Sequence, residues 1–127
     1  MTREEFEKLV EEEFPRAVPE KFHHLLHNVD FLVEDEPDAR TRAEHGLKDD
    51  ETLLGLYRGV PHTARGDMYG VGATLPDSIT LYQKPIEDEA AHAGDVRMVI
   101  RETIWHEVAH HFGFDEDQVE DRERRGI

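Results

Sequence analysis

The stretch from Asp95 to Gly113 constrains the fold of this chain more than any other. Aspartate is a favoured helix N-cap, and glycine permits the left-handed turn that ends a helix, so these residues bound a predicted helix over Val96–Phe112. The first half of this helix is amphipathic, whereas its second half is apolar on nearly every side. A helix that is apolar all round is buried, so the rest of the chain has to cover it.

This helix carries three ionisable side chains close together, His106, Glu107 and His110. Histidines four residues apart lie on one helix face, and their imidazoles can converge on one tetrahedral zinc ion. Glu107 lies about 100° further round the helix, where a general base can reach a metal-bound water. On the inner side of a buried helix these groups cost too much free energy unless they are paired or liganded. We therefore expect a metal site, with histidines satisfied by core hydrogen bonds as the alternative.

Acidic residues follow Gly113 directly, at Asp115, Glu116 and Asp117. The turn at the glycine would bring them back toward the metal, where a carboxylate can complete the ligand set. The alternative is that Asp115 caps a short terminal helix and the cluster only complements its dipole.

The run from His106 to Glu116 resembles the extended zincin motif, His-Glu-x-x-His-x-x-Gly-x-x-Asp. Together with Leu53–Gly59 and Ile79–Pro85, it makes most of the chain similar to the minimal zincins, a family of small bacterial metallopeptidases. This sequence departs from the pattern in one place, because Glu116 stands where the family has aspartate.

The resemblance implies that His106, His110 and Glu116 are zinc ligands and that Glu107 is the catalytic base. Glutamate binds zinc through oxygen but is one methylene longer than aspartate, so Asp117 is an alternative third ligand. The implied function is zinc-dependent hydrolysis of peptide bonds in a peptide or protein substrate. A metal-binding module without turnover and an interaction module on the same fold are the alternatives.

Composition sets the limits on this function. A chain of 127 residues predicts one domain over residues 1–127. Its net charge of −15 disfavours nucleic acid and anionic membranes as partners. The absence of cysteine excludes disulfides and thiolate metal sites. No signal peptide or apolar membrane span is recognisable, which predicts a cytoplasmic protein.

Periodicity elsewhere predicts helices and strands that could cover the motif helix. Two N-terminal helices are expected, one that starts at Thr2 and stops before Pro15, and one that starts near Pro19. Further predictions are three strands and a short helix: Val29–Val33, Leu53–Arg58, Ser78–Tyr82 and Ile86–His92. We therefore expect an α+β, truncated zincin-like fold, with N-terminal helices and a three- or four-stranded sheet packed on the buried active-site helix.

Two further segments carry histidines. His23 and His27 lie four apart in the second helix, so a second metal pair is conceivable, although a polar helix face is favoured. The long irregular stretch Gly59–Pro76 is expected near the mouth of the site. His62 and Arg65 lie in it, and solvent exposure is favoured over substrate contact for both.

Three remaining predictions concern the surroundings of the motif. By resemblance, Ser78–Tyr82 is the edge strand that aligns an extended peptide by main-chain pairing. Tyr82 is expected to be a half-buried strand tyrosine, with transition-state donor as the alternative. His111 is expected to serve packing or support rather than metal ligation.

Overall fold

The computed structural model describes residues 1–59 and 75–113. Its elements follow one another as helices and strands of an α+β fold: α1 (Arg3–Ala17), the 3-10 helix η1 (Glu20–Leu26), β1 (Val29–Glu34), α2 (Ala39–Glu44), β2 (Gly55–Arg58), β3 (Asp77–Tyr82), α4 (Gln83–Ala93) and α5 (Val96–His111). The predicted fold class is therefore confirmed, and three strands form the sheet.

The sheet has the order β1-β3-β2, so β3 is its central strand. β1 runs parallel to β3, with Val29 opposite Asp77, and β2 runs antiparallel to β3, with Gly55 opposite Leu81. The prediction that Ser78–Tyr82 is an edge strand is therefore wrong. Strand neighbours are set by pairing between distant segments, which a local sequence pattern does not carry. Among the described strands, the edge strand beside α5 is β2.

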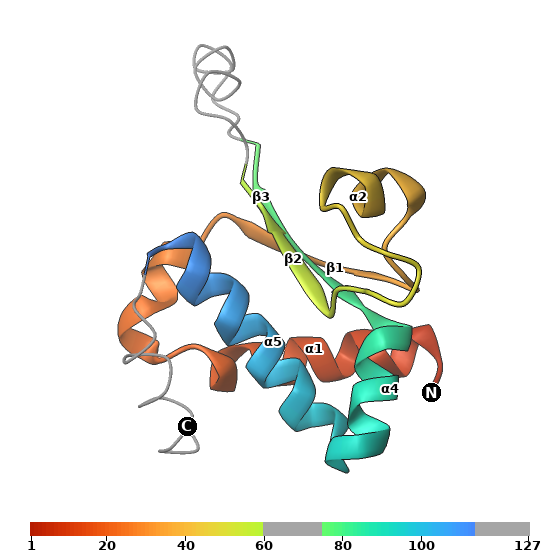
Figure 1. Ribbon diagram of the computed structural model, residues 1–127. Coiled ribbons are helices and arrows are strands. Elements are labelled where there is room, and N and C mark those ends of the chain that lie inside the picture. Colours follow the sequence, from red (N-terminus) through yellow and green to blue (C-terminus); the bar gives the residue numbers. More distant parts are fainter. Residues whose placement is uncertain (60–74, 114–127) are drawn as a thin grey trace.

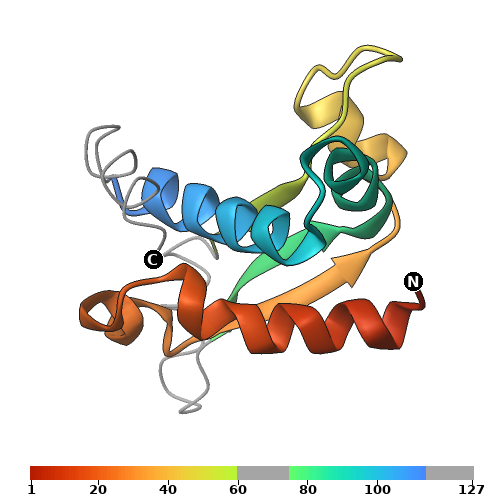
Figure 2. The same ribbon diagram turned by 90° about the horizontal axis from the view of Figure 1, so that it is seen from below.

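Helices cover the two faces of the sheet unequally (Figure 1). α1, α4 and α5 lie on one side, and the short α2 lies on the other. The core fills the space between the sheet and the three longer helices, with fully buried residues that include Phe6, Ile79, Leu81, Ile86, Ile100, Ile104 and Val108. Figure 2 shows α5 lying alongside α1. Burying this apolar surface is the main favourable contribution to the fold.

The ends of α5 agree with the sequence prediction. The Asp95 carboxylate accepts hydrogen bonds from the backbone N–H groups of Arg97 and Met98, at 2.9 and 3.3 Å. At the other end, Gly113 has a φ of +77°, the left-handed conformation that glycine adopts without strain. No helix in the described part of the chain is long and apolar enough to cross a lipid bilayer.

The N-terminal helices differ from the prediction in two ways. α1 does not stop before Pro15 but continues to Ala17. Proline removes one backbone donor, but Ala17 and Val18 are buried in the core, and that packing holds the last turn in place.

The second N-terminal segment, η1, is a 3-10 helix, in which residues four apart do not stack on one face. His23 Nε2 lies 2.7 Å from the carbonyl oxygen of Val18, and His27 Nδ1 lies 2.9 Å from that of His24. These local contacts favour the polar-face interpretation over a second metal pair.

Candidate metal centre

His106, Glu107 and His110 lie on one strip of α5. The two imidazole centroids are 6.1 Å apart, with ring planes inclined at 46°. The prediction that this strip is buried is wrong, because His110 is exposed and the other two are only partly buried. α5 packs its broad apolar face against α1, α4 and the sheet. Its ionisable strip stays open, since burying charge without a partner costs free energy.

Glu107 is held in place by the edge strand. Its Oε1 accepts a hydrogen bond from the backbone N–H of Tyr57 in β2, at 3.0 Å. Burial raises the pKa of the Glu107 carboxyl above its ordinary value, while the Tyr57 hydrogen bond and the nearby His110 and His106 partly oppose that rise. A carboxylate with a raised pKa accepts a proton more readily near neutral pH.

Gly55 allows β2 to come this close to α5. A Cβ atom at Gly55 would lie 2.7 Å from Thr103 Cγ2, 3.2 Å from the Thr80 carbonyl oxygen and 3.8 Å from Glu107 Cγ. The first of these distances is too short for any real side chain. The missing side chain therefore lets the backbone of β2 reach the Glu107 carboxylate.

The residue that bonds Glu107, Tyr57, belongs to a cluster of three side chains that the sequence patterns did not bring together. The Tyr57 hydroxyl donates to Asp77 Oδ2 at 2.8 Å, and the Tyr57 ring stacks on the His111 ring with centroids 3.7 Å apart and planes at 13°. The expectation that His111 serves packing is confirmed. For Tyr57 and Asp77 the sequence offered weak signals. Tyr57 is an aromatic residue in a predicted strand, and Asp77 is a carboxylate just before the predicted strand Ser78–Tyr82. Both features are common.

Tyr82 lies on the other face of the sheet. It is buried rather than half-buried, and it lines a hollow of about 300 Å³ with Thr41, Arg58 and Thr80, next to α2. Burial raises the pKa of its hydroxyl. Since Glu107 is on the α5 side, the alternative of a transition-state donor at Tyr82 is wrong.

The described residues supply two of the donors that a zinc site needs. No group of three His, Cys, Asp or Glu side chains suited to one metal occurs within residues 1–59 and 75–113. Two neutral imidazoles one helical turn apart fit half of a tetrahedral zinc site, and a carboxylate from another segment would have to join them. The predicted third ligands, Glu116 and Asp117, lie outside the described residues, as do His62 and Arg65.

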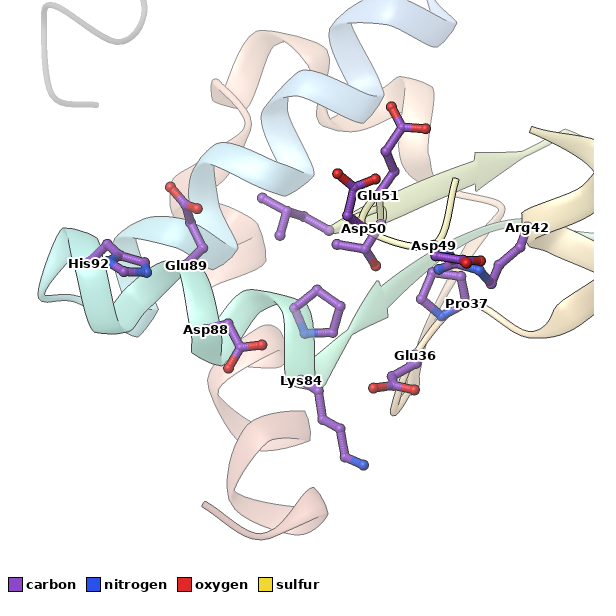
Figure 3. A pocket seen from close by; sticks show the side chains of 13 residues that line it. Glu36, Pro37, Arg42, Asp49, Asp50, Glu51, Lys84, Asp88, Glu89 and His92 are labelled. Carbon is purple, nitrogen blue, oxygen red and sulfur yellow. The ribbon is translucent and has the colours of Figure 1, made fainter. Parts of the chain in front are cut away.

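A second hollow, of about 570 Å³, lies between α4 and the segment before β2 (Figure 3). Six acidic side chains line it, with Arg42, Lys84 and His92 among the others: Glu36, Asp49, Asp50, Glu51, Asp88 and Glu89. None of the three motif residues on α5 borders this hollow. The candidate metal centre and the acidic hollow are therefore separate features.

Comparisons with known proteins agree with this geometry. A family model described as zincin-like metallopeptidase matches residues 26–126, which include all of β1, β2, β3 and α5. A solved structure of a conserved hypothetical protein from Thermus thermophilus is similar at 27% identity and a TM-score of 0.57. The alignment covers 88% of this chain and 94% of that one. No match was found among the curated proteins.

Proposed function

Because the chain belongs to the zincin-like metallopeptidase family, we propose that it hydrolyses peptide bonds with a zinc ion on His106 and His110 and with Glu107 as general base. One observation carries the proposal. Glu107 is partly buried, is held through Oε1 by the edge strand, and lies beside two histidines one helical turn apart. These groups would supply two of the zinc ligands and the general base of metal-assisted hydrolysis.

Glu107 would act through the oxygen that the edge strand does not hold. When bound, zinc supplies a Lewis acid that polarises a carbonyl and makes a water acidic. Oε1 stays on the Tyr57 N–H, and Oε2 takes the proton from the attacking water and passes it to the leaving amine. The raised pKa of Glu107 favours this transfer near neutral pH.

β2 offers the substrate an edge to pair with. The backbone N–H of Tyr82 donates to the Leu54 carbonyl, whereas the N–H of Tyr57 points away from β3 to Glu107. The backbone groups of Gly55 and Tyr57 therefore point away from β3. Because the Tyr57 N–H is bonded to Glu107, a substrate would pair through the Gly55 backbone and the Tyr57 carbonyl. An extended peptide that pairs along this edge would pass directly beside Glu107.

We propose Glu116 as the third ligand, with Asp117 as its competitor. The family match supports a peptide or protein as the substrate class. The net charge of −15 disfavours the phosphate backbone of nucleic acid and anionic membranes as partners.

Elemental analysis of the untagged protein, loaded with zinc and dialysed without chelator, tests the metal site. We expect about one zinc per chain, lost in His106→Ala. His24→Ala, which removes an exposed histidine from η1, is the matched control and should keep its zinc. Glu116→Ala and Asp117→Ala then separate the two third ligands. Zinc that binds equally well to His106→Ala would contradict the proposal.

Glu107→Gln tests the base. This variant should retain zinc and lose peptide hydrolysis by about 100-fold or more, because the amide cannot accept the proton. The assay is cleavage of a mixed peptide library followed by mass spectrometry. Zinc without hydrolysis in the wild-type protein would instead support a metal-binding module.

A further inference from the structure

The backbone amide that holds Glu107 belongs to Tyr57, whose N–H points away from the partner strand β3. Tyr57 faces Ile79 across the antiparallel pair, and its N–H points outward to Glu107 Oε1. β2 is paired on one side by β3 and spans four residues. A short edge strand is held less firmly than a central one, so the position of this amide depends on how the Tyr57 side chain is anchored.

The Tyr57 side chain is anchored at two points by residues from other elements. Its hydroxyl donates to Asp77 Oδ2 at the start of β3, at 2.8 Å, and its ring lies flat on His111 at the end of α5. His111 Nε2 is itself 3.9 Å from Asp77 Oδ2, so the three side chains contact one another in a closed group. Asp77 is in turn fixed by its backbone N–H, which donates to the Asn28 carbonyl at 3.1 Å.

Gly59 leaves room for this arrangement. A Cβ atom there would lie 3.1 Å from His111 Cε1 and 3.8 Å from Asp77 Oδ1, and the first of these distances is tighter than most real contacts. The end of β2 is thus shaped around the His111 ring. The cluster joins β2, β3 and α5, and the Tyr57–Glu107 hydrogen bond connects two of these elements, β2 and α5.

We propose that Tyr57, Asp77 and His111 form a positioning unit for Glu107. This unit holds the Tyr57 N–H in place, and that N–H donates to Glu107 Oε1. The proposal rests on the proposed function for its catalytic consequence. Pinning one carboxylate oxygen sets where the other one lies, and catalysis is sensitive to displacements of such groups by fractions of an ångström. None of the three residues touches the reacting atoms in this scheme.

The Tyr57 amide resonance tests the positioning without reference to activity. In ¹H–¹⁵N spectra, Tyr57→Phe keeps the ring stack but removes the bond to Asp77, and His111→Leu removes the stack. Each should speed the hydrogen exchange of the residue 57 amide by about 10-fold, toward the rate in Glu107→Ala, which has no acceptor for this amide. Tyr82→Phe removes a tyrosine hydroxyl from the opposite face of the same sheet and should leave the signal unchanged.

Kinetics test the catalytic consequence. Tyr57→Phe should lower kcat by about 10- to 100-fold with unchanged KM and zinc content, and it should cost nothing further in a Glu107→Gln background. Asp77→Asn, which keeps an oxygen acceptor for Tyr57, should retain most of the activity that Asp77→Ala loses.

The two failures are distinguishable. If the hydrogen exchange of the residue 57 amide stays unchanged in both Tyr57→Phe and His111→Leu while both variants remain folded by circular dichroism, the positioning unit is refuted. If the amide responds but the wild-type protein hydrolyses no peptide, the positioning of Glu107 stands and the proposed function fails.

Discussion

At the scale of single residues, the site depends on the absence of a side chain at Gly55. The distance between β2 and α5 is set by the absence of a side chain that would otherwise meet Thr103 and the Thr80 carbonyl. Thr103 is itself fixed, because its hydroxyl donates to the Val99 carbonyl at 2.7 Å. Rotating the Thr103 side chain away would therefore cost this hydrogen bond. The short distance between β2 and α5 thus depends on residues of both elements.

Gly55→Ala should lower the free energy of unfolding by about 1–3 kcal/mol, the usual cost of forcing an extra methyl group into a packed interface. The second substitution Thr103→Ser removes Cγ2 and keeps the hydroxyl, so it should restore part of that loss in the double variant. Urea denaturation of the two single variants and the double variant measures both effects. Equal stability of Gly55→Ala and wild type would contradict the predicted clash.

At the scale of elements, local signals in the sequence located helices and strands but not their neighbours. Asp95 and Gly113 bound the motif helix correctly, because caps act within a few residues. The open side of α5 was mispredicted, since a local count of apolar residues does not tell which side receives α1, α4 and the sheet. The order β1-β3-β2 and the meeting of Tyr57, Asp77 and His111 depend on pairing between distant segments.

α1 and α5 are joined by a buried carboxylate that the sequence pattern did not reveal. The Glu13 side chain is 1% exposed and accepts hydrogen bonds from Arg97 and Arg101, both at 2.8 Å. Burial raises the pKa of the Glu13 carboxyl, but the two arginines outweigh it, and the pKa ends below the ordinary value of 4.5. The folded state therefore favours the charged form of Glu13.

Glu13→Gln should lower the free energy of unfolding at pH 7 by about 1–3 kcal/mol, because two arginines lose a charged partner. A depressed pKa contributes stability that is fully present above the unfolded value of 4.5 and is lost as the pH falls through the folded pKa. The difference in free energy of unfolding between wild type and Glu13→Gln should therefore become smaller below pH 4.5. Urea denaturation at several pH values measures this difference. A difference in free energy of unfolding that grows as the pH falls would contradict the lowered pKa of Glu13.

At the scale of the whole molecule, charge opposes compactness. The chain has 30 acidic and 15 basic side chains, giving a net charge of −15. Many of these acids are exposed, and six of them gather around the hollow beside α4. Their mutual repulsion destabilises the folded state and is screened by salt.

Raising NaCl from about 20 mM to about 300 mM at pH 7 should therefore increase Tm by a few degrees. The same change near pH 4.9, the sequence pI, should have little effect, because the net charge there is close to zero. Differential scanning calorimetry at both pH values provides the comparison. A Tm that falls with salt at pH 7 would mean that surface ion pairs such as Arg3–Asp35 outweigh the repulsion.

The strand order also governs when this chain can fold during its synthesis. β1 pairs with β3, and Val29 lies opposite Asp77 in this pair. Glu13 accepts a hydrogen bond from Arg101, which is 88 residues later in the sequence. At about 5–20 residues per second, Arg101 leaves the ribosome on the order of 4–18 s after Glu13. α1 and β1 therefore emerge without their partners, and a chain that terminates before α5 leaves α1 without the helix it packs on.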